Sequence, residues 1–385
     1  MKNVLCMKGG QGESSYLNNS QAQSRNLQMM LHALEETLDK VQLPPRAPGK
    51  PLLTAADLGC SCGRNTLVVA DAIVEHMTKL CRTSRGRDGD HADDPEFCFY
   101  FSDLPSNDFN TLFGLLPQHA ASSDEGSRRR YFAAAVPGSF HDRLFPERFI
   151  NVFTSTYCLH WLSEVPKEVA DRRSQAYNKG KVFVHGASEV TGAAYRRQFQ
   201  SDMSRFLRCR AAELKPGGAI FLVFLGRPSS ASPTDQGRSL NLFGAMFEES
   251  WRDLVDEGMI DGEKMDSFNV PSYAATLEEF REAVDADGSF EVNRLELVMG
   301  SRVAVDDEPD DRRAVGRRVA NNQRSIFGPL VEAHIGMALA DVLFARVQSR
   351  AEARAVELVD EMRVHMHIVC SLTHVTTDKI ISDTP

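Results

Sequence analysis

The chain has 385 residues, of which 42% are apolar, so it can bury a core sufficient for one large domain or two small ones. Its formal net charge is −9, with acidic and basic residues interspersed, which argues against partnership with nucleic acid or an anionic membrane. No stretch approaches the roughly 18 apolar residues of a membrane span, and the N-terminus has no charged-then-apolar leader. The eight cysteines are scattered along the chain, as is typical of reduced thiols. Together with the absence of a membrane span and a leader, they predict a cytoplasmic protein.

The first 25 residues are polar and rich in glycine, with MKGGQGESSYLNNSQAQ at 7–23. Composition alone leaves open an ordinary flexible tail or an ordered segment with a binding role. A helix is predicted to follow from about Ser24 to Val41.

A buried strand, a glycine-rich turn and the start of a helix are predicted in succession at residues 53–66, LTAADLGCSCGRNT. Gly59 and Gly63 allow backbone to approach a ligand closely. The segment lacks the G-x-G-x-x-G pattern of dinucleotide sites, which favours a smaller adenosyl ligand. A purely structural turn is the alternative reading.

The second strand, EFCFYFSD at 96–103, is almost continuously apolar, as expected of a strand covered on both faces. It ends on Asp103, which could bind ribose hydroxyls or simply cap the next helix. Further strands are predicted at 131–140, 150–162, 219–226 and 365–375, with helices at about 195–214 and 327–360 and a turn at KPGG before the fifth strand. Alternation of strand and helix predicts a mostly parallel α/β sheet. The long connections, 164–195, 235–290 and 304–345, are expected to form a helical cap over the carboxyl edge of the sheet.

Together, these segments resemble the plant SABATH-type carboxyl methyltransferases, a family that acts on salicylate, jasmonate, indole-acetate and theobromine. The resemblance extends from residue 5 to about 372 and rests on MKGGQGESSYLNNSQAQ, DLGCSCGRN, FSDLPSNDFN, VPGSFHDRLFP, YCLHWLSEVP, KPGGAIFLVFLGR and FNVPSYAATLEEF. The runs SDLPSNDFNTLF, FLRCRAAELKPGG, PTDQG and VEAHIG are most similar to the branch that acts on indole-3-acetic acid and on cinnamic or p-coumaric acid.

The resemblance implies one methyltransferase unit over residues 1–385 with a seven-stranded Rossmann-like sheet. Its core would comprise about 24–163, 195–230, 290–304 and 345–375, and residues 1–23 would form an N-terminal lid. Relatives are often homodimers, so a homodimer is expected.

The resemblance also implies the cofactor S-adenosylmethionine and a set of site residues. The cofactor would be surrounded by Tyr16, Ser20, Cys60, Asn65, Asp103, Leu104, Ser139 and Phe140, with Asp103 on the ribose and Asp57 shaping the site of the aminocarboxypropyl arm. Gln23 and Trp161 would hold the substrate carboxylate, and Tyr157 and His160 would line the acceptor pocket. A cation site, for Mg²⁺, is implied at Asn178, Asp266, Phe268 (main chain) and Asn269. Cys62 and Cys158 depart from the family, because many relatives have serine there.

In the expected reaction, the main task of the protein is to orient the substrate carboxylate toward the methyl group of the cofactor. A carboxylic acid with a pKa of about 4 is ionised at neutral pH, so its attack on a sulfonium methyl requires no general base. Gln23 and Trp161 supply N–H donors suited to an anionic oxygen pair. Trp161 as a core aromatic and His160 as a pocket-wall histidine are the structural alternatives.

Three other functions stay open at this point. Within the same chemistry, the alternatives are N-methylation of a purine alkaloid and methylation of salicylate, benzoate or jasmonate. A catalytically silent protein that binds the cofactor or an acidic hormone is the alternative from another class. A nucleic-acid methyltransferase is disfavoured, since the chain has neither an N/D-P-P-Y run nor a basic face.

Overall fold

The computed structural model describes residues 5–45, 50–85, 94–121, 130–300, 310–361 and 365–375. These residues form one seven-stranded sheet with the strand order β3-β2-β1-β4-β5-β7-β6. Strands β3, β2, β1, β4 and β5 run parallel to one another, and β7 pairs antiparallel with both β5 and β6. The predicted α/β class with a mostly parallel sheet is therefore confirmed. The strands are β1 (Leu52–Leu58), β2 (Glu96–Asp103), β3 (Phe132–Pro137), β4 (Ile150–Thr156), β5 (Leu214–Leu225), β6 (Phe290–Gly300) and β7 (His365–His374).

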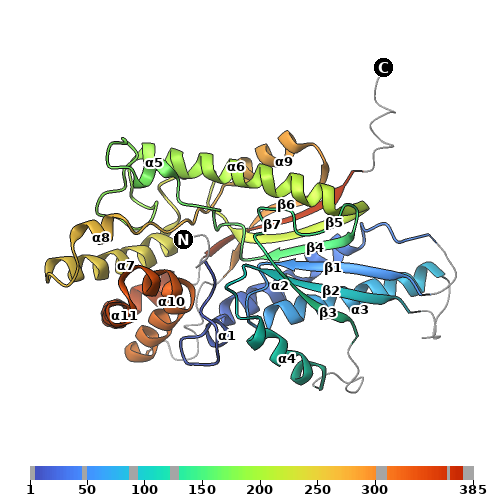
Figure 1. Ribbon diagram of the computed structural model, residues 1–385, viewed down its shortest axis with the longest axis horizontal. Helices are drawn as coiled ribbons and strands as arrows, with labels where there is room; N and C mark the ends of the chain where they lie inside the picture. Colours follow the sequence, from blue (N-terminus) through green and yellow to red (C-terminus); the bar gives the residue numbers. More distant parts are fainter. Residues whose placement is uncertain are drawn as a thin grey trace.

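Helices cover both faces of the sheet (Figure 1). One face carries α2 (Gln21–Leu38), α3 (Asn65–Arg85) and α4 (Phe109–Ala121), whose apolar side chains form a core with β1 and β2. The other face carries α6 (Glu189–Glu213) and α9 (Leu277–Asp287), which pack on β4, β5 and β7. Two further helices are short, namely α1 (Tyr16–Asn19) and α5 (Lys167–Ala170).

Local sequence explains how several of these helices begin and end. Helix α9 starts with a capping box, in which the Thr276 hydroxyl accepts from Glu279 N and the Glu279 carboxylate accepts from Thr276 N. It ends at Gly288, whose φ of 71° is in the left-handed region. Helix α6 starts where the Ser188 hydroxyl accepts from Thr191 N at 3.1 Å.

A third group of helices lies together at one end of the sheet (Figure 1) and has its own hydrophobic core. The group comprises α7 (Arg238–Asp256), α8 (Gly262–Asp266), α10 (Arg312–Ile335), α11 (Met337–Ala353) and α12 (Ala355–Glu361). Buried side chains of α11 and α12 belong to this core. Residues from 345 onward were expected to belong to the sheet unit instead. Conversely, α9 packs on the sheet, although it was assigned to the cap. We propose that the cap runs through Glu361 and leaves out α9.

Several element boundaries differ from the prediction. The strand predicted at 150–162 ends at Thr156, because the chain turns at Tyr157, whose φ is 63° and whose N–H donates to Val223 O at 2.6 Å. The run beyond it forms a turn rather than a strand, with Leu159 and Leu162 in the core and Tyr157 and Trp161 half-buried. The helix predicted at 327–360 is divided by Gly336, with a φ of 80°, into parts of α10 and α11. The KPGG segment lies within the bounds of β5, next to an irregular pairing with β4.

None of the helices in the described ranges is long and apolar enough to cross a membrane.

Candidate active site

The strand order reverses between β1 and β4, so the loops that follow these two strands diverge and leave a crevice at their carboxyl ends. Gly59 follows β1 with a φ of 80°, and a Cβ at this position would collide with Cys158 Sγ. Glycine is thus required both by the backbone conformation and by the close approach of the loop after β4. The glycine-rich turn found in the sequence lies at the topological switch point.

A cavity of about 890 Å³ occupies this crevice. Five predicted cofactor residues line it, namely Tyr16, Asp103, Leu104, Ser139 and Phe140. It is also lined by Leu5, Met7, Gly59, Ser61, His141, Asp142, Tyr157, Cys158, Trp161, Leu162, Ser163 and Arg205. The cavity therefore brings together segments from the N-terminus, β1, β2, β4 and α6.

Asp103 is held rigidly at the end of β2. Its Oδ2 accepts from Ser61 N and its Oδ1 accepts from Leu104 N, both at 2.7 Å. Burial raises the pKa of this carboxyl to about 6, against the lowering effect of the two backbone N–H donors. Each carboxylate oxygen keeps a further acceptor site, so Asp103 can accept hydrogen bonds from a ligand hydroxyl in the cavity.

The other four predicted cofactor residues lie beside the cavity rather than on its surface. Asp57 is buried and accepts from Thr154 Oγ1 at 2.8 Å, and burial raises its pKa to about 6. Cys60 is buried, and burial raises the pKa of its thiol. Asn65 donates to Ser20 O at 3.4 Å, and Ser20 lies next to Gly63.

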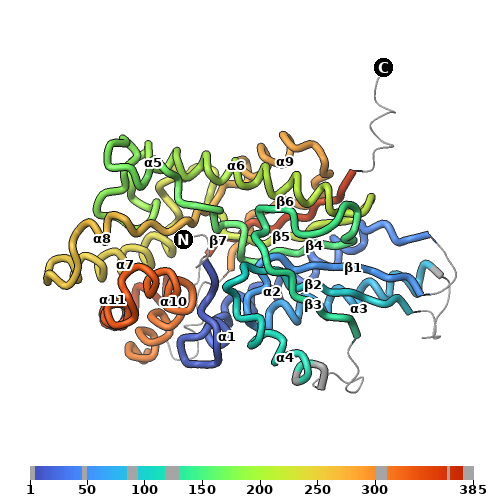
Figure 2. Tube along the Cα trace, in the orientation of Figure 1, coloured from blue at the N-terminus to red at the C-terminus, as the bar shows by residue number. Residues whose placement is uncertain are grey.

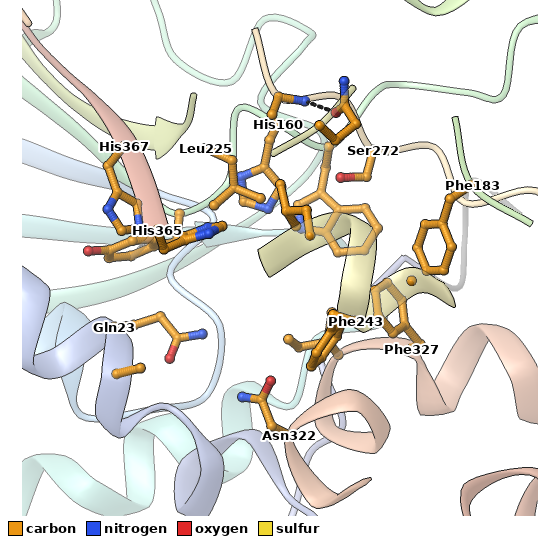
Figure 3. Close-up of a pocket in the computed structure, with 18 of the residues that line it drawn as sticks. Gln23, His160, Phe183, Leu225, Phe243, Ser272, Asn322, Phe327, His365 and His367 are labelled. Atoms are coloured by element: carbon orange, nitrogen blue, oxygen red, sulfur yellow. Dashed lines mark hydrogen bonds between the residues drawn. The ribbon is translucent and has the colours of Figure 1, made fainter. Parts of the chain in front are cut away.

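A second cavity, of about 960 Å³, opens between the sheet and the cap (Figure 3). Four residues, Met7, Tyr16, Tyr157 and Trp161, line both cavities, so the two cavities meet there. No Asp, Glu, Lys or Arg occurs among the described residues that line the second cavity. Its other lining residues are Ala22, Gln23, Asn26, His160, Phe183, Val184, His185, Leu225, Gln236, Leu240, Phe243, Gly244, Ser272, Ala274, Asn322, Ile326, Phe327, His365 and His367.

All four residues predicted to contact the acceptor, namely Gln23, Tyr157, His160 and Trp161, line this second cavity. Trp161 is fixed by pairing of its strand-like segment with residues 271–273: Leu162 N donates to Pro271 O and Tyr273 N donates to His160 O. The side-chain oxygen of Gln23 is buried and forms no hydrogen bond with a described residue.

Burial favours the neutral form of two polar groups in the second cavity. Burial lowers the pKa of His185, and it raises the pKa of the Tyr157 phenol. An anion in this cavity would meet no Lys or Arg side chain among the described lining residues.

Three of the four predicted cation ligands, Asn178, Asp266 and Asn269, are already joined by hydrogen bonds to one another. Asn178 Nδ2 donates to Asn269 Oδ1 at 2.9 Å, and Asn269 Nδ2 donates to Asp266 O at 3.3 Å. Asp266 accepts from Gly180 N and from the Tyr177 hydroxyl, while the Phe268 ring packs on Trp251. Oxygen ligands suit Mg²⁺, but this set contains a single carboxylate. The described residues contain no group of three or more His, Cys, Asp or Glu side chains arranged to hold a metal ion.

Sequence reasoning missed several lining residues. Ser61, with a φ of 53°, lies in the glycine-rich turn and could have been included on that ground. Arg205 of α6 and the cap residues Phe183, Asn322 and Phe327 carry no local signal, because they reach the cavities only through the tertiary fold.

A Rossmann-like sheet with a cavity at its switch point and an acidic residue at the end of the second strand is the arrangement of S-adenosylmethionine-dependent methyltransferases. The family model described as SAM dependent carboxyl methyltransferase matches residues 2–375. The chain belongs to this family and is an S-adenosylmethionine-dependent carboxyl O-methyltransferase.

Known proteins of this kind are similar to the chain over nearly its full length. The chain is 53% identical to indole-3-acetate O-methyltransferase 1 of Oryza sativa subsp. japonica, covering 97% of this chain and 93% of the relative. It is 51% identical to indole-3-acetate O-methyltransferase 1 of Arabidopsis thaliana, covering 97% and 96%. A solved structure of loganic acid methyltransferase with SAH superposes with a TM-score of 0.85 at 30% identity, covering 97% of this chain and 99% of that one.

Proposed function

We propose that this enzyme transfers the methyl group of S-adenosylmethionine to the carboxylate of indole-3-acetic acid. The observation that carries the proposal is the pair of adjoining cavities, which meet at Trp161 and Tyr157. The first suits the cofactor, and the second is a largely aromatic pocket for a flat acid. The names of the two relatives above support the choice of acid.

The uncharged pocket favours an acceptor that brings its own nucleophile. An indole-3-acetate carboxylate is ionised at neutral pH and needs no general base. Gln23 and Trp161 would hold its oxygens by N–H donation, while the sulfonium of the cofactor would supply the attractive charge. Catalysis is then mainly alignment of one oxygen with the methyl carbon and the departing sulfur.

In this proposal, each residue set has a distinct role. Asp103 binds the ribose, and Tyr16, Leu104, Ser139 and Phe140 surround the rest of the cofactor. The residues around the cofactor are supported, on the side away from the cavity, by Ser20, Asp57, Cys60 and Asn65. Tyr157 and His160 form the wall of the acceptor pocket, and His160 takes no proton.

Three further assignments complete the proposal. Mg²⁺ would bind at the Asn178, Asp266, Phe268 and Asn269 cluster only if the hydrogen bond between the two asparagines opened. All eight cysteines are free thiols, which supports a cytoplasmic location. A homodimer, without nucleic-acid or membrane partners, is proposed from the family resemblance and the acidic composition.

The decisive experiment is a competition assay with methyl-labelled cofactor. Indole-3-acetate, cinnamate, p-coumarate, salicylate, benzoate, jasmonate and theobromine are scored by kcat/KM. We expect indole-3-acetate to have the highest value. A higher value for cinnamate or p-coumarate would contradict the proposed substrate, and preference for theobromine would contradict the chemistry.

A further inference from the structure

Asn322 of α10 lies in the wall of the acceptor pocket with only 4% of its surface exposed. Its Nδ2 donates to the main-chain oxygen of Asn19 at 3.0 Å. Because a carbonyl oxygen can only accept, this bond fixes the orientation of the amide. The Asn322 oxygen then points into the pocket, as Figure 3 shows, and no described residue donates a hydrogen bond to it.

Other polar groups in the pocket are less suited to accept a hydrogen bond from a ligand. Gln236 uses both ends of its amide, since its oxygen accepts from Ala274 N at 2.7 Å and its nitrogen donates to Pro233 O at 2.8 Å. The His185 ring packs against Gly244, and its Nε2 lies 3.5 Å from Glu248 Oε2. Ser272 carries a rotatable hydroxyl that can donate as well as accept. The fixed carbonyl of Asn322 is therefore better suited to accept from an N–H group than these three side chains.

The position of Asn322 relative to the carboxylate donors also fits an indole acid. Its partner Asn19 is the last residue of α1, and Gln23 lies in the first turn of α2, which begins two residues after Asn19. Gln23 and Asn322 line the same pocket, so a ligand whose carboxylate is held by Gln23 can present a ring N–H group to Asn322. Phe327 lies between Trp161 and Phe183, with ring centroids 6.1 and 5.5 Å away, so flat aromatic surfaces surround this space.

We propose that the side-chain oxygen of Asn322 accepts a hydrogen bond from the ring N–H of the acid, which makes Asn322 a specificity-determining residue. The proposal rests on the proposed function and adds the group that distinguishes an indole from a ring without an N–H donor. An unpaired buried acceptor disfavours ligands that lack this donor.

The test compares indole-3-acetate with benzofuran-3-acetate, whose ring has nearly the same shape and carries oxygen in place of N–H. We expect kcat/KM of the unmodified enzyme to favour the indole acid by roughly five- to tenfold or more. In Asn322→Ala, this ratio should fall to near one. A general loss of folding or alignment affects both substrates and cancels in the ratio.

Ser272→Ala is the matched control, because Ser272 lines the same pocket and offers the other candidate acceptor. It should keep the ratio of the unmodified enzyme. An unchanged ratio in Asn322→Ala, or a ratio near one in Ser272→Ala alone, would overturn the assignment of Asn322 while leaving the proposed function intact. If the unmodified enzyme methylates neither acid, the proposed function itself fails.

Discussion

Two carboxyls shielded from water, Asp57 and Asp103, make the region around the switch point sensitive to pH. Burial raises both pKa values from the ordinary range of an aspartate to about 6. Between about pH 4 and pH 6 the folded state therefore holds protons that the unfolded chain has lost. The free energy of unfolding falls as the pH rises through this window and is constant above it with respect to these groups.

Cofactor binding should release protons from Asp103. Ribose hydroxyl donors favour the ionised carboxylate, so binding of S-adenosylhomocysteine at pH 6 should release about half a proton and, at about pH 7.5, almost none. Calorimetry in two buffers of different ionisation enthalpy measures this number. Asp103→Asn should lower both the affinity and the proton release, whereas Trp161→Phe should keep both. Equal proton release in the Asp103→Asn variant would show that Asp103 does not bind the ribose.

At the scale of elements, the segment 271–275 positions the acceptor pocket. It pairs with the turn that carries His160 and Trp161 and is itself held by a buried ion pair. Arg227 donates to Ala274 O at 2.6 Å, its main-chain N–H donates to Ala275 O, and its guanidinium contacts both oxygens of Glu279 at 2.7 and 2.9 Å. Trp161 therefore depends on a cation and an anion that do not line either cavity.

Removal of the anion from this pair should be strongly destabilising. Glu279→Gln leaves the buried Arg227 charge without its partner, so we expect a loss of about 3 kcal/mol or more in the free energy of unfolding. Arg196→Gln is the control, because its half-exposed side chain contacts the same carboxylate from outside at 3.3 Å, and its loss should stay below about 1 kcal/mol. Denaturant unfolding of both variants measures the difference. Equal losses would mean that Arg227 and Glu279 do not form the supporting pair.

Sequence patterns predicted the elements with strong local signals and missed those set by tertiary contacts. The apolar run before Asp103 and the glycine turn after Asp57 identified β1 and β2 together with the switch-point crevice. The run YCLHWL looked like a strand because its side chains are buried, but burial does not distinguish a packed turn from a strand. Asn322 could not be found from pattern, because its importance comes from contact with Asn19, some 300 residues earlier in the chain.

At the scale of the whole molecule, the N-terminal segment connects the cap to the sheet (Figure 2). The main-chain N–H of Lys8 donates to Ser325 O at 2.8 Å, and its ammonium lies 2.9 Å from Glu332 of α10. On the sheet side, Gly10 N donates to Asp108 at 2.8 Å. Since Met7 and Tyr16 line both cavities, this segment forms a wall shared by the two cavities.

Deletion of residues 1–23 should give a folded but inactive protein, because it removes that shared wall and the Gln23 donor and admits water to the site. Near-ultraviolet circular dichroism and a thermal transition report folding, and the labelled-methyl assay reports turnover. Lys8→Met is the control, since a partly exposed ion pair contributes about 1 kcal/mol or less, and it should keep most of the activity. Full activity of the truncated protein would mean that the segment is a dispensable tail.

In the proposed mechanism, the substrate carboxylate reacts without a general base. The most direct measurement is kcat/KM for indole-3-acetate at saturating S-adenosylmethionine over roughly pH 6.5 to 9, in the unmodified enzyme and in His160→Gln. The substrate carboxylate is fully ionised over this range, and saturating cofactor removes the contribution of Asp103. We expect a flat profile in both proteins, with His160→Gln altering only the level. A rising limb near neutral pH that disappears in His160→Gln would show that His160 accepts a proton and would contradict the mechanism.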